Sequence, residues 1–249
     1  DVYKHYDSYI QALKKDGQIG TASNYTSSMH SLKLFRPSLS FNEITVDFLK
    51  GYEKWLLSQG KSVSTVGIYL RPLRSLINQA ISDGALSKDY AYPFGTKGRN
   101  KYQIPTSKNV KKALTLDEIK LIYNYIPQPN SWEERARDFW LFSYLANGMN
   151  MTDISRLRYS DIDGEYIKFV RSKTRNTSQS VSPIVVHLSE DIRNIIKKWG
   201  STDDSAENLV FSIIKNGDSL EKQRADIQQF TKMVNKYMKM IAEKLGINK

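Results

Sequence analysis

The most specific pattern in this chain is SWEERARDFWLFSYLANGMNMTDISRLRYSDID, residues 131–163. Its first half is apolar on nearly all sides, so we predict a buried central helix that ends at Gly148. Asn150 or Thr152 can then cap a short second helix, with Asp153 close to its N-terminus. We expect the other elements to pack around this pair of helices.

This pattern resembles the first catalytic box of the tyrosine recombinases (the phage-integrase family), in which a buried helix precedes T-G-x-R-x-x-E-L-x-x-L-x-W-x-D-I. The chain has N-G-M-N-M-T-D-I-S-R-L-R-Y-S-D-I-D, and Asn150 stands where the family carries its first catalytic arginine. The G-M-N-x-x-D-I form resembles a branch typical of Bacteroides-type mobile elements, in which an arginine of the preceding helix substitutes. The positions that fit the family pattern are Gly148, Asp153, Leu157, Tyr159, Asp161 and Ile162.

Arg137 is our candidate for the substitute arginine, because it lies on the face of the predicted central helix that points into the domain. The alternative is an ordinary ion pair with Glu133, four residues earlier, and Arg135 is a rival candidate. We assign Asn150 and Asp153 to the support of the catalytic box. A plain helix cap is the alternative for both, and it is the one we favour.

Composition favours a polyanionic partner. Lysine and arginine number 37 against 26 aspartates and glutamates, a net charge of +11, although a general surplus for solubility would look similar. The absence of cysteine excludes disulfides, cysteine nucleophiles and thiolate metal sites, and it fits a reducing compartment. We find neither a membrane-spanning apolar run nor a signal peptide, and expect a soluble protein of the bacterial cytoplasm without metal or cofactor.

The first part of the chain, residues 1–90, has four amphipathic helical patterns and no strand pattern. This arrangement resembles the family's SAM-like core-binding domain, a helical bundle that grips duplex DNA. Arg71 and Arg74 project from the fourth predicted helix at i, i+3, and we expect both to bind DNA.

Residues 91–112 are predicted to be a linker, because they contain prolines, glycines and six positive charges but no acidic residue. A basic segment between two basic domains can lie along phosphates, so we assign Lys97, Arg99 and Lys101 to DNA binding as well. The alternative is a solvated tether.

Residues 113–249 are predicted to form the N-terminal part of an α+β catalytic domain, so that the whole chain is mainly α with a small β-hairpin or sheet. A hairpin with strands at 165–173 and 181–188 carries Lys173, which matches the lysine that the family places at such a turn. The resemblance implies that Lys173 is the general acid for the leaving 5′ oxygen. The alternative is a solvated lysine at a strand end.

The family completes its site with H-x-x-R and a tyrosine nucleophile. None of the three histidines, His5, His30 and His187, begins that motif, so we expect a fragment that is inactive alone. The complete protein would cleave and rejoin duplex DNA through a 3′-phosphotyrosyl intermediate as a homotetramer, with no small-molecule substrate. Two alternatives stay open: a non-catalytic DNA-binding protein on the recombinase scaffold, and a helical protein-interaction module whose charge is incidental.

Overall fold

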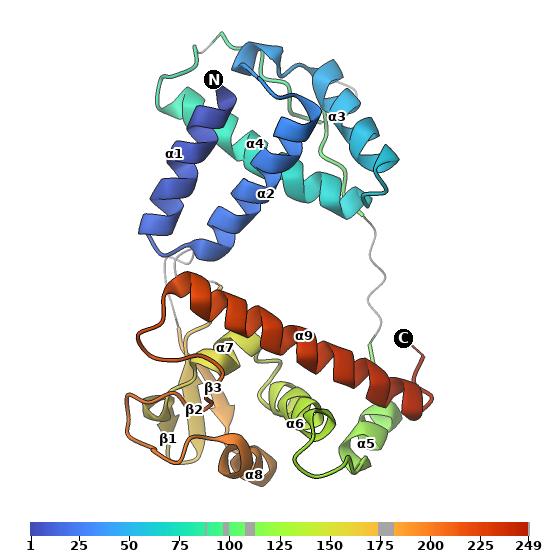
Figure 1. Ribbon diagram of the computed structural model, residues 1–249, viewed down its shortest axis with the longest axis vertical. Helices are drawn as coiled ribbons and strands as arrows, with labels where there is room; N and C mark the ends of the chain where they lie inside the picture. The colour runs from blue at the N-terminus through green and yellow to red at the C-terminus, as the bar shows by residue number, and fades with distance from the viewer. Residues whose placement is uncertain (88, 97–99, 108–112, 174–181, 249) are drawn as a thin grey trace. The chain divides into compact units, whose positions relative to one another are not determined.

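The structure is a computed structural model that describes residues 1–87, 89–96, 100–107, 113–173 and 182–248. The chain divides into two units, Asp1–Val110 and Lys111–Lys249 (Figure 1). Each unit has its own hydrophobic core. The described residues are mainly helical with one small antiparallel sheet, which confirms the predicted fold class. In none of their helices is there an apolar stretch long enough to span a bilayer.

The first unit is a bundle of four α-helices and one 3-10 turn. Helix α2 packs against both α1 and α4, and Tyr6 and Tyr52 are completely buried between the helices. Their hydroxyl groups are paired inside the core, that of Tyr6 with Ser28 at 2.8 Å and that of Tyr52 with Ser31 at 2.6 Å, so neither phenol is buried without a partner. The elements are α1 (Val2–Lys15), α2 (Ile19–Phe35), η1 (Phe41–Glu43), α3 (Val46–Ser58) and α4 (Val63–Ser82).

Much of the predicted linker packs onto this bundle. Phe94 and Tyr102 are both 4% exposed, and the Tyr102 hydroxyl donates a hydrogen bond to Glu53 of α3 at 2.6 Å. The segment differs from a solvated tether because its aromatic side chains remove apolar surface from water by completing the bundle core. Its basic end, from Lys108 to Lys112, lies outside the described residues.

The second unit places helices around a three-stranded antiparallel sheet with the order β1-β2-β3. Ile167 of β2 pairs with Val186 of β3, and both point into the core. The strands are β1 (Ile162–Asp163), β2 (Tyr166–Phe169) and β3 (Ile184–His187). The helices are α5 (Leu116–Asn124), α6 (Trp132–Leu145), α7 (Met151–Arg156), η2 (Tyr159–Asp161), α8 (Glu190–Trp199) and α9 (Leu220–Lys244).

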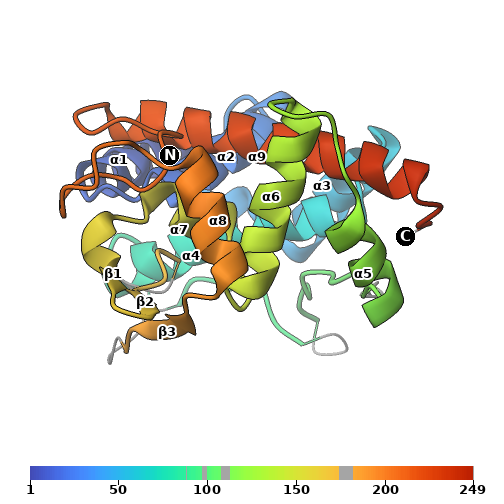
Figure 2. The same cartoon turned by 90° about the horizontal axis from the view of Figure 1, so that it is seen from below.

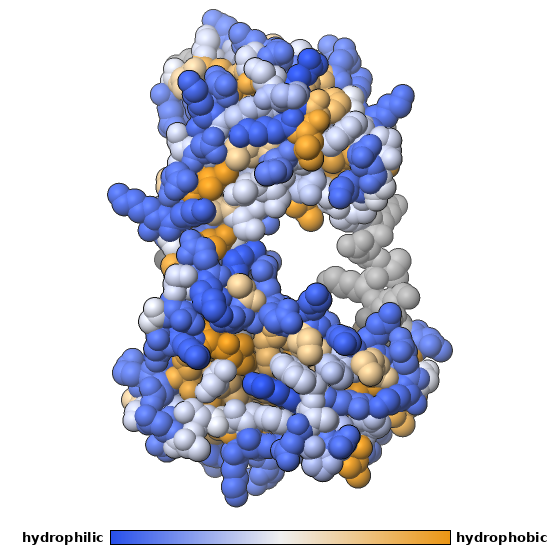
Figure 3. Space-filling view, viewed as in Figure 1, coloured by the Kyte–Doolittle hydropathy of each residue, from blue (hydrophilic) through white to orange (hydrophobic). Residues whose placement is uncertain are grey.

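Helix α6 is the central element of this unit, as predicted. It packs against α9 on one side and against α8 on another (Figure 2). Phe139 and Phe142 are completely buried, and both rings contact Phe211. The helix ends where Asn147 and Gly148 adopt positive φ angles of 55° and 76°, a conformation that glycine adopts without strain. Polar side chains cover most of the visible surface of each unit (Figure 3).

Candidate nucleic-acid interface and catalytic box

Three of the predicted DNA-binding residues lie in the first unit among the described residues. Arg71 and Arg74 are exposed on α4, one turn apart. Lys101 donates a hydrogen bond to the carbonyl oxygen of Tyr92, and Arg74 is close enough to Tyr92 to act on its phenol. Burial raises the pKa of Tyr92, and the positive charge of Arg74 opposes that rise. Both basic residues thus have Tyr92 as a neighbour, Lys101 at its carbonyl oxygen and Arg74 on the side of its phenol.

A glycine allows the segment after Lys101 to lie against α4. A Cβ atom on Gly67 would approach the carbonyl oxygen of Pro105 to 3.1 Å and the Arg71 guanidinium to 3.2 Å. The backbone at Pro105 therefore runs past α4 beside Arg71. Lys97 and Arg99, the other two predicted DNA-binding residues, lie outside the described residues.

In the second unit Asn150 caps α7. Its Oδ1 accepts hydrogen bonds from the backbone N–H groups of Thr152 at 2.9 Å and Asp153 at 3.1 Å. Its Nδ2 donates to Asp153 Oδ2 at 2.6 Å. The sequence left Asn150 and Thr152 as alternatives for this cap, and the structure has Asn150 in that position. The amide of Asn150 is also hydrogen-bonded to the buried carboxylate of Asp153.

The same carboxylate connects α7 to the end of β2. Asp153 Oδ1 accepts a hydrogen bond from the backbone N–H of Ser172 at 2.9 Å. Ser172 directly precedes Lys173, whose side chain is exposed. Asn150 and Asp153, two of the four residues predicted for the catalytic box, are therefore bonded to each other, and Asp153 is bonded to the residue before the third, Lys173.

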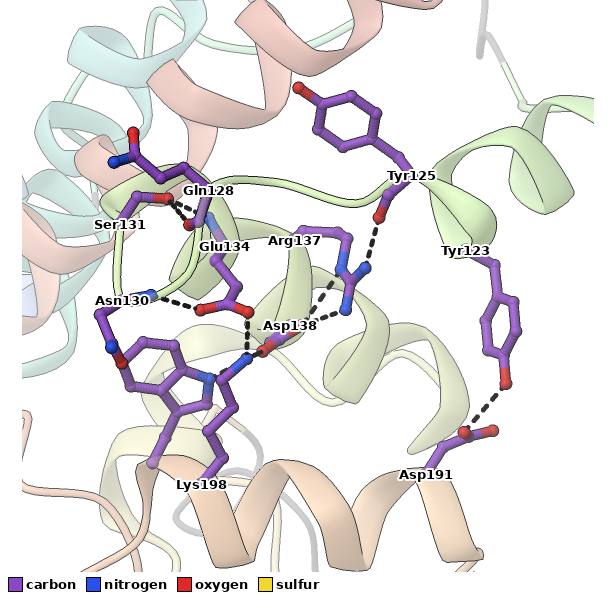
Figure 4. Close-up of polar contacts among 11 residues, drawn as sticks. Tyr123, Tyr125, Gln128, Asn130, Ser131, Glu134, Arg137, Asp138, Asp191 and Lys198 are labelled. Atoms are coloured by element: carbon purple, nitrogen blue, oxygen red, sulfur yellow. Dashed lines mark hydrogen bonds and ion pairs between the residues drawn. The ribbon is translucent and has the colours of Figure 1, made fainter.

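Arg137, the fourth, lies in a different network (Figure 4). Its guanidinium donates to Asp138 Oδ1 through Nε at 3.1 Å and Nη2 at 2.7 Å, and to the carbonyl oxygen of Tyr125 through Nη1. Within the described residues no hydrogen bond or ion pair joins it to Asn150, Asp153 or Lys173. The hydrogen-bond partners of Arg137 are thus Asp138 and Tyr125, and its role as the substitute arginine stays a prediction.

Asp138 is the centre of that network. It is 3% exposed and also accepts hydrogen bonds from Trp199 Nε1 at 2.8 Å and Lys198 Nζ at 3.0 Å, both at the end of α8. Burial raises the pKa of Asp138, but the hydrogen bonds from Trp199, Arg137 and Lys198 outweigh burial and hold the pKa below its usual value. The alternative partner of Arg137, Glu133, instead pairs with Lys244 at 2.6 Å.

Arg135, the rival candidate, is surrounded by rings rather than by carboxylates. Burial lowers its pKa, and its Nε has no hydrogen-bond partner within the described part of the chain. This cation contributes to packing between α6, α8 and α9. The rings whose centroids lie 5.2–5.7 Å from its guanidinium carbon are those of Trp132, Phe139, Trp199 and Phe230.

A protein-family model matches the first part of the chain. Residues 1–104 match the family described as phage integrase SAM-like domain. The first unit is thus similar to a phage integrase SAM-like domain. No curated protein matches the sequence.

Solved structures extend the likeness across the whole chain. A lambda integrase tetramer bound to a Holliday junction is 17% identical with a TM-score of 0.57, and the match covers 93% of this chain and 63% of that one. A lambda integrase (75-356) dimer bound to a COC′ core site is 18% identical with a TM-score of 0.56, and the match covers 94% of this chain and 78% of that one. The Tn1549 transposon integrase in complex with circular intermediate DNA is 17% identical with a TM-score of 0.57, and the match covers 96% of this chain and 79% of that one.

The chain therefore has the fold of the phage-integrase, or tyrosine recombinase, family, and the predicted resemblance is confirmed at that level. It spans 63% of the length of the integrase in the Holliday-junction tetramer. Its affiliation with the Bacteroides-type branch stays a prediction.

Two arginines of the integrase-fold unit were absent from the predicted site. Arg156 and Arg158 line a pocket together with Asp153 and Ser172. Arg156 follows Asp153 by one helical turn, so the i, i+3 spacing on α7 was the signal that could have revealed it. Among the described residues, histidine and carboxylate side chains form no cluster suited to a metal ion.

Proposed function

We propose that this chain is the DNA-binding part and an incomplete catalytic part of a site-specific DNA recombinase, an integrase of a bacterial mobile element. The observation that carries the proposal is the hydrogen bond between Asp153 and Ser172, which joins the proposed first catalytic box to the turn after β2 that bears Lys173. It occurs on a fold shared with integrases that were solved on DNA.

In the complete protein a tyrosine oxygen would attack a backbone phosphorus and form a 3′-phosphotyrosyl ester. Lys173 would give its proton to the 5′ oxygen as that bond breaks. The ester conserves the energy of the broken bond, so religation requires no nucleotide cofactor. Asn150 and Asp153 would hold α7 against the lysine strand, and Arg137 keeps its proposed role as substitute for the first arginine.

The partner proposed for the SAM-like domain is duplex DNA, bound without sequence readout by basic side chains on phosphates. Arg71, Arg74 and Lys101 supply part of this surface, and Lys97 and Arg99 belong to the same proposal. The complete protein would act as a homotetramer on two duplexes in the bacterial cytoplasm.

Fluorescence anisotropy with a labelled duplex of about 30 base pairs tests DNA binding directly. We expect log K to fall linearly with log[salt], with a slope of about −0.9 for each phosphate neutralised. Replacing Arg71 and Arg74 by glutamine should reduce that slope by about 2. The matched control replaces Lys14 and Lys15 of α1 by glutamine, which removes the same charge. This control should retain most of the affinity for the duplex.

A chain that binds no duplex at low salt would contradict the proposal and favour the interaction module. The second candidate function is a non-catalytic DNA-binding protein on the same scaffold, which Asn150 in the arginine position favours. Covalent trapping separates the two. A nicked suicide duplex should accumulate a phosphotyrosyl adduct if the complete protein is an enzyme, and no adduct if it only binds.

A further inference from the structure

A polar pocket lies between α7, the end of β2 and the segment that leads into α9. Its lining includes Asp153 and Ser172, the two residues whose hydrogen bond joins α7 to the segment before Lys173. Residues that precede α9, among them Leu209 and Ile214, also line the pocket. The other polar residues of the lining are Arg156, Arg158, Asp161, Asn216 and Gln223.

Both carboxylates of this pocket are already engaged. Asp153 accepts hydrogen bonds on one oxygen from Ser172 and on the other from Asn150. Asp161 accepts from the backbone N–H of Arg158 at 2.8 Å and caps η2. Neither carboxylate forms an ion pair with an arginine of the pocket in the described structure.

The two arginines differ in their engagement. The guanidinium of Arg158 donates to the carbonyl oxygen of Glu207 and lies 3.5 Å from Asn216 Oδ1. Arg156 is exposed at the end of α7 and has no hydrogen-bond or ion-pair partner among the described residues. One complete guanidinium group is therefore available at the pocket.

Neutral donors accompany it. The side-chain amide of Asn216 carries two N–H groups, and the amide of Gln223 uses one of its two on the carbonyl oxygen of Asp218 at 3.1 Å. An available guanidinium beside amide donors suits a tetrahedral oxyanion, because the planar fork of arginine can bind two phosphate oxygens at once.

We propose that this pocket binds a phosphodiester of the DNA backbone close to the strand end that carries Lys173, with Arg156 as its main ligand. The inference rests on the proposed function, since it takes DNA to be the partner. Ser172 lines the pocket and directly precedes Lys173, so a phosphate held here fixes the path of the backbone beside the lysine. Arg156 is thereby a binding residue for the strand.

The test compares Arg156→Gln with Arg193→Gln in the full 249-residue chain. Arg193 is an exposed arginine of α8, 3.4 Å from the carbonyl oxygen of Gly164 and outside the pocket, so the two variants lose the same charge. Anisotropy across a salt series should show the slope of log K against log[salt] reduced by about 1 for Arg156→Gln and nearly unchanged for Arg193→Gln.

A second measurement locates the phosphate. We compare duplexes in which one phosphate at a time is replaced by a neutral methylphosphonate with the unmodified duplex. At one position the replacement should weaken binding by the wild-type chain but leave the affinity of Arg156→Gln unchanged. If the wild-type chain binds no duplex, the proposed function itself fails and this inference fails with it. If the wild-type chain binds but the two variants have equal slopes and no such position exists, only the pocket assignment is overturned.

Discussion

Asp153 accepts a hydrogen bond from the backbone N–H of Ser172, and its second carboxylate oxygen accepts one from the side chain of Asn150. One buried carboxylate thus holds the cap of α7 and the turn after β2 at the same time. These two hydrogen bonds join α7 to the residue before Lys173.

Replacing Asp153 by asparagine should lower the free energy of unfolding by about 1–3 kcal/mol. One end of the new amide is a donor and faces either the Nδ2 of Asn150 or the N–H of Ser172. Asn150 cannot rotate to relieve this, because its Oδ1 is held by two backbone N–H groups of α7. Urea denaturation of the chain measures the effect.

The control for that variant is Asn150→Ser, which keeps a capping oxygen and removes the opposing amide group. In the Asn150→Ser background, Asp153→Asn should cost less than it does in the wild-type chain. A double-mutant cycle without coupling would contradict the bridging role of Asp153.

Arg137→Ala should destabilise the chain by about 2 kcal/mol, because the buried carboxylate of Asp138 loses two charge-assisted hydrogen bonds. Arg137→Lys keeps the charge and should cost less. A catalytic role predicts more: in the complete protein Arg137→Ala should abolish cleavage at a temperature where it is fully folded and leave binding nearly intact. Asn150→Ala should be milder, and equal, slight effects of both on cleavage would contradict the assignment.

Acid should destabilise the second unit partly through Asp138. Because the pKa of Asp138 is lowered in the folded chain, its contribution is complete above the unfolded-state pKa of about 3.9 and is lost as the pH falls through the folded value. The unfolding free energy, measured in denaturant from about pH 7 to about pH 2, should therefore fall below about pH 4. Asp138→Asn should flatten that fall. Asp117→Asn, a change at an exposed surface ion pair, should leave the fall close to that of the wild-type chain.

Tyr102→Phe tests whether the segment predicted as a linker, residues 91–112, is held to α3 through the hydroxyl of Tyr102. Burial and the neighbouring Glu53 carboxylate both raise the pKa of Tyr102, so its hydroxyl stays protonated and donates. Losing this bond should cost about 1 kcal/mol in urea denaturation. The matched control is Tyr123→Phe, which removes a hydroxyl bonded to Asp191 at an exposed position and should cost almost nothing. Equal costs would contradict the attachment.

Local sequence was sufficient where the partners of a group lie within one helical turn. Asn150, one of the two cap candidates, caps α7, and Gly148 lies at the turn that ends the central helix. Periodicity likewise predicted α6 as the buried central helix. Each of these features depends on backbone groups a few residues away, which the sequence displays directly.

Contacts between distant segments could not be predicted in this way. The helical face of Arg137 was visible in the sequence, but its partners depended on how α6 and the loop at Tyr125 pack, and packing placed its guanidinium on Asp138 and the Tyr125 carbonyl oxygen. Packing likewise surrounded Arg135 with rings and folded Tyr102 onto α3. Caps and helix ends follow from residues near in sequence, whereas the link from Asp153 to Ser172 and the pocket at Arg156 exist only once the helices and the sheet are assembled, because a side chain's partners are chosen by the surfaces that burial brings together.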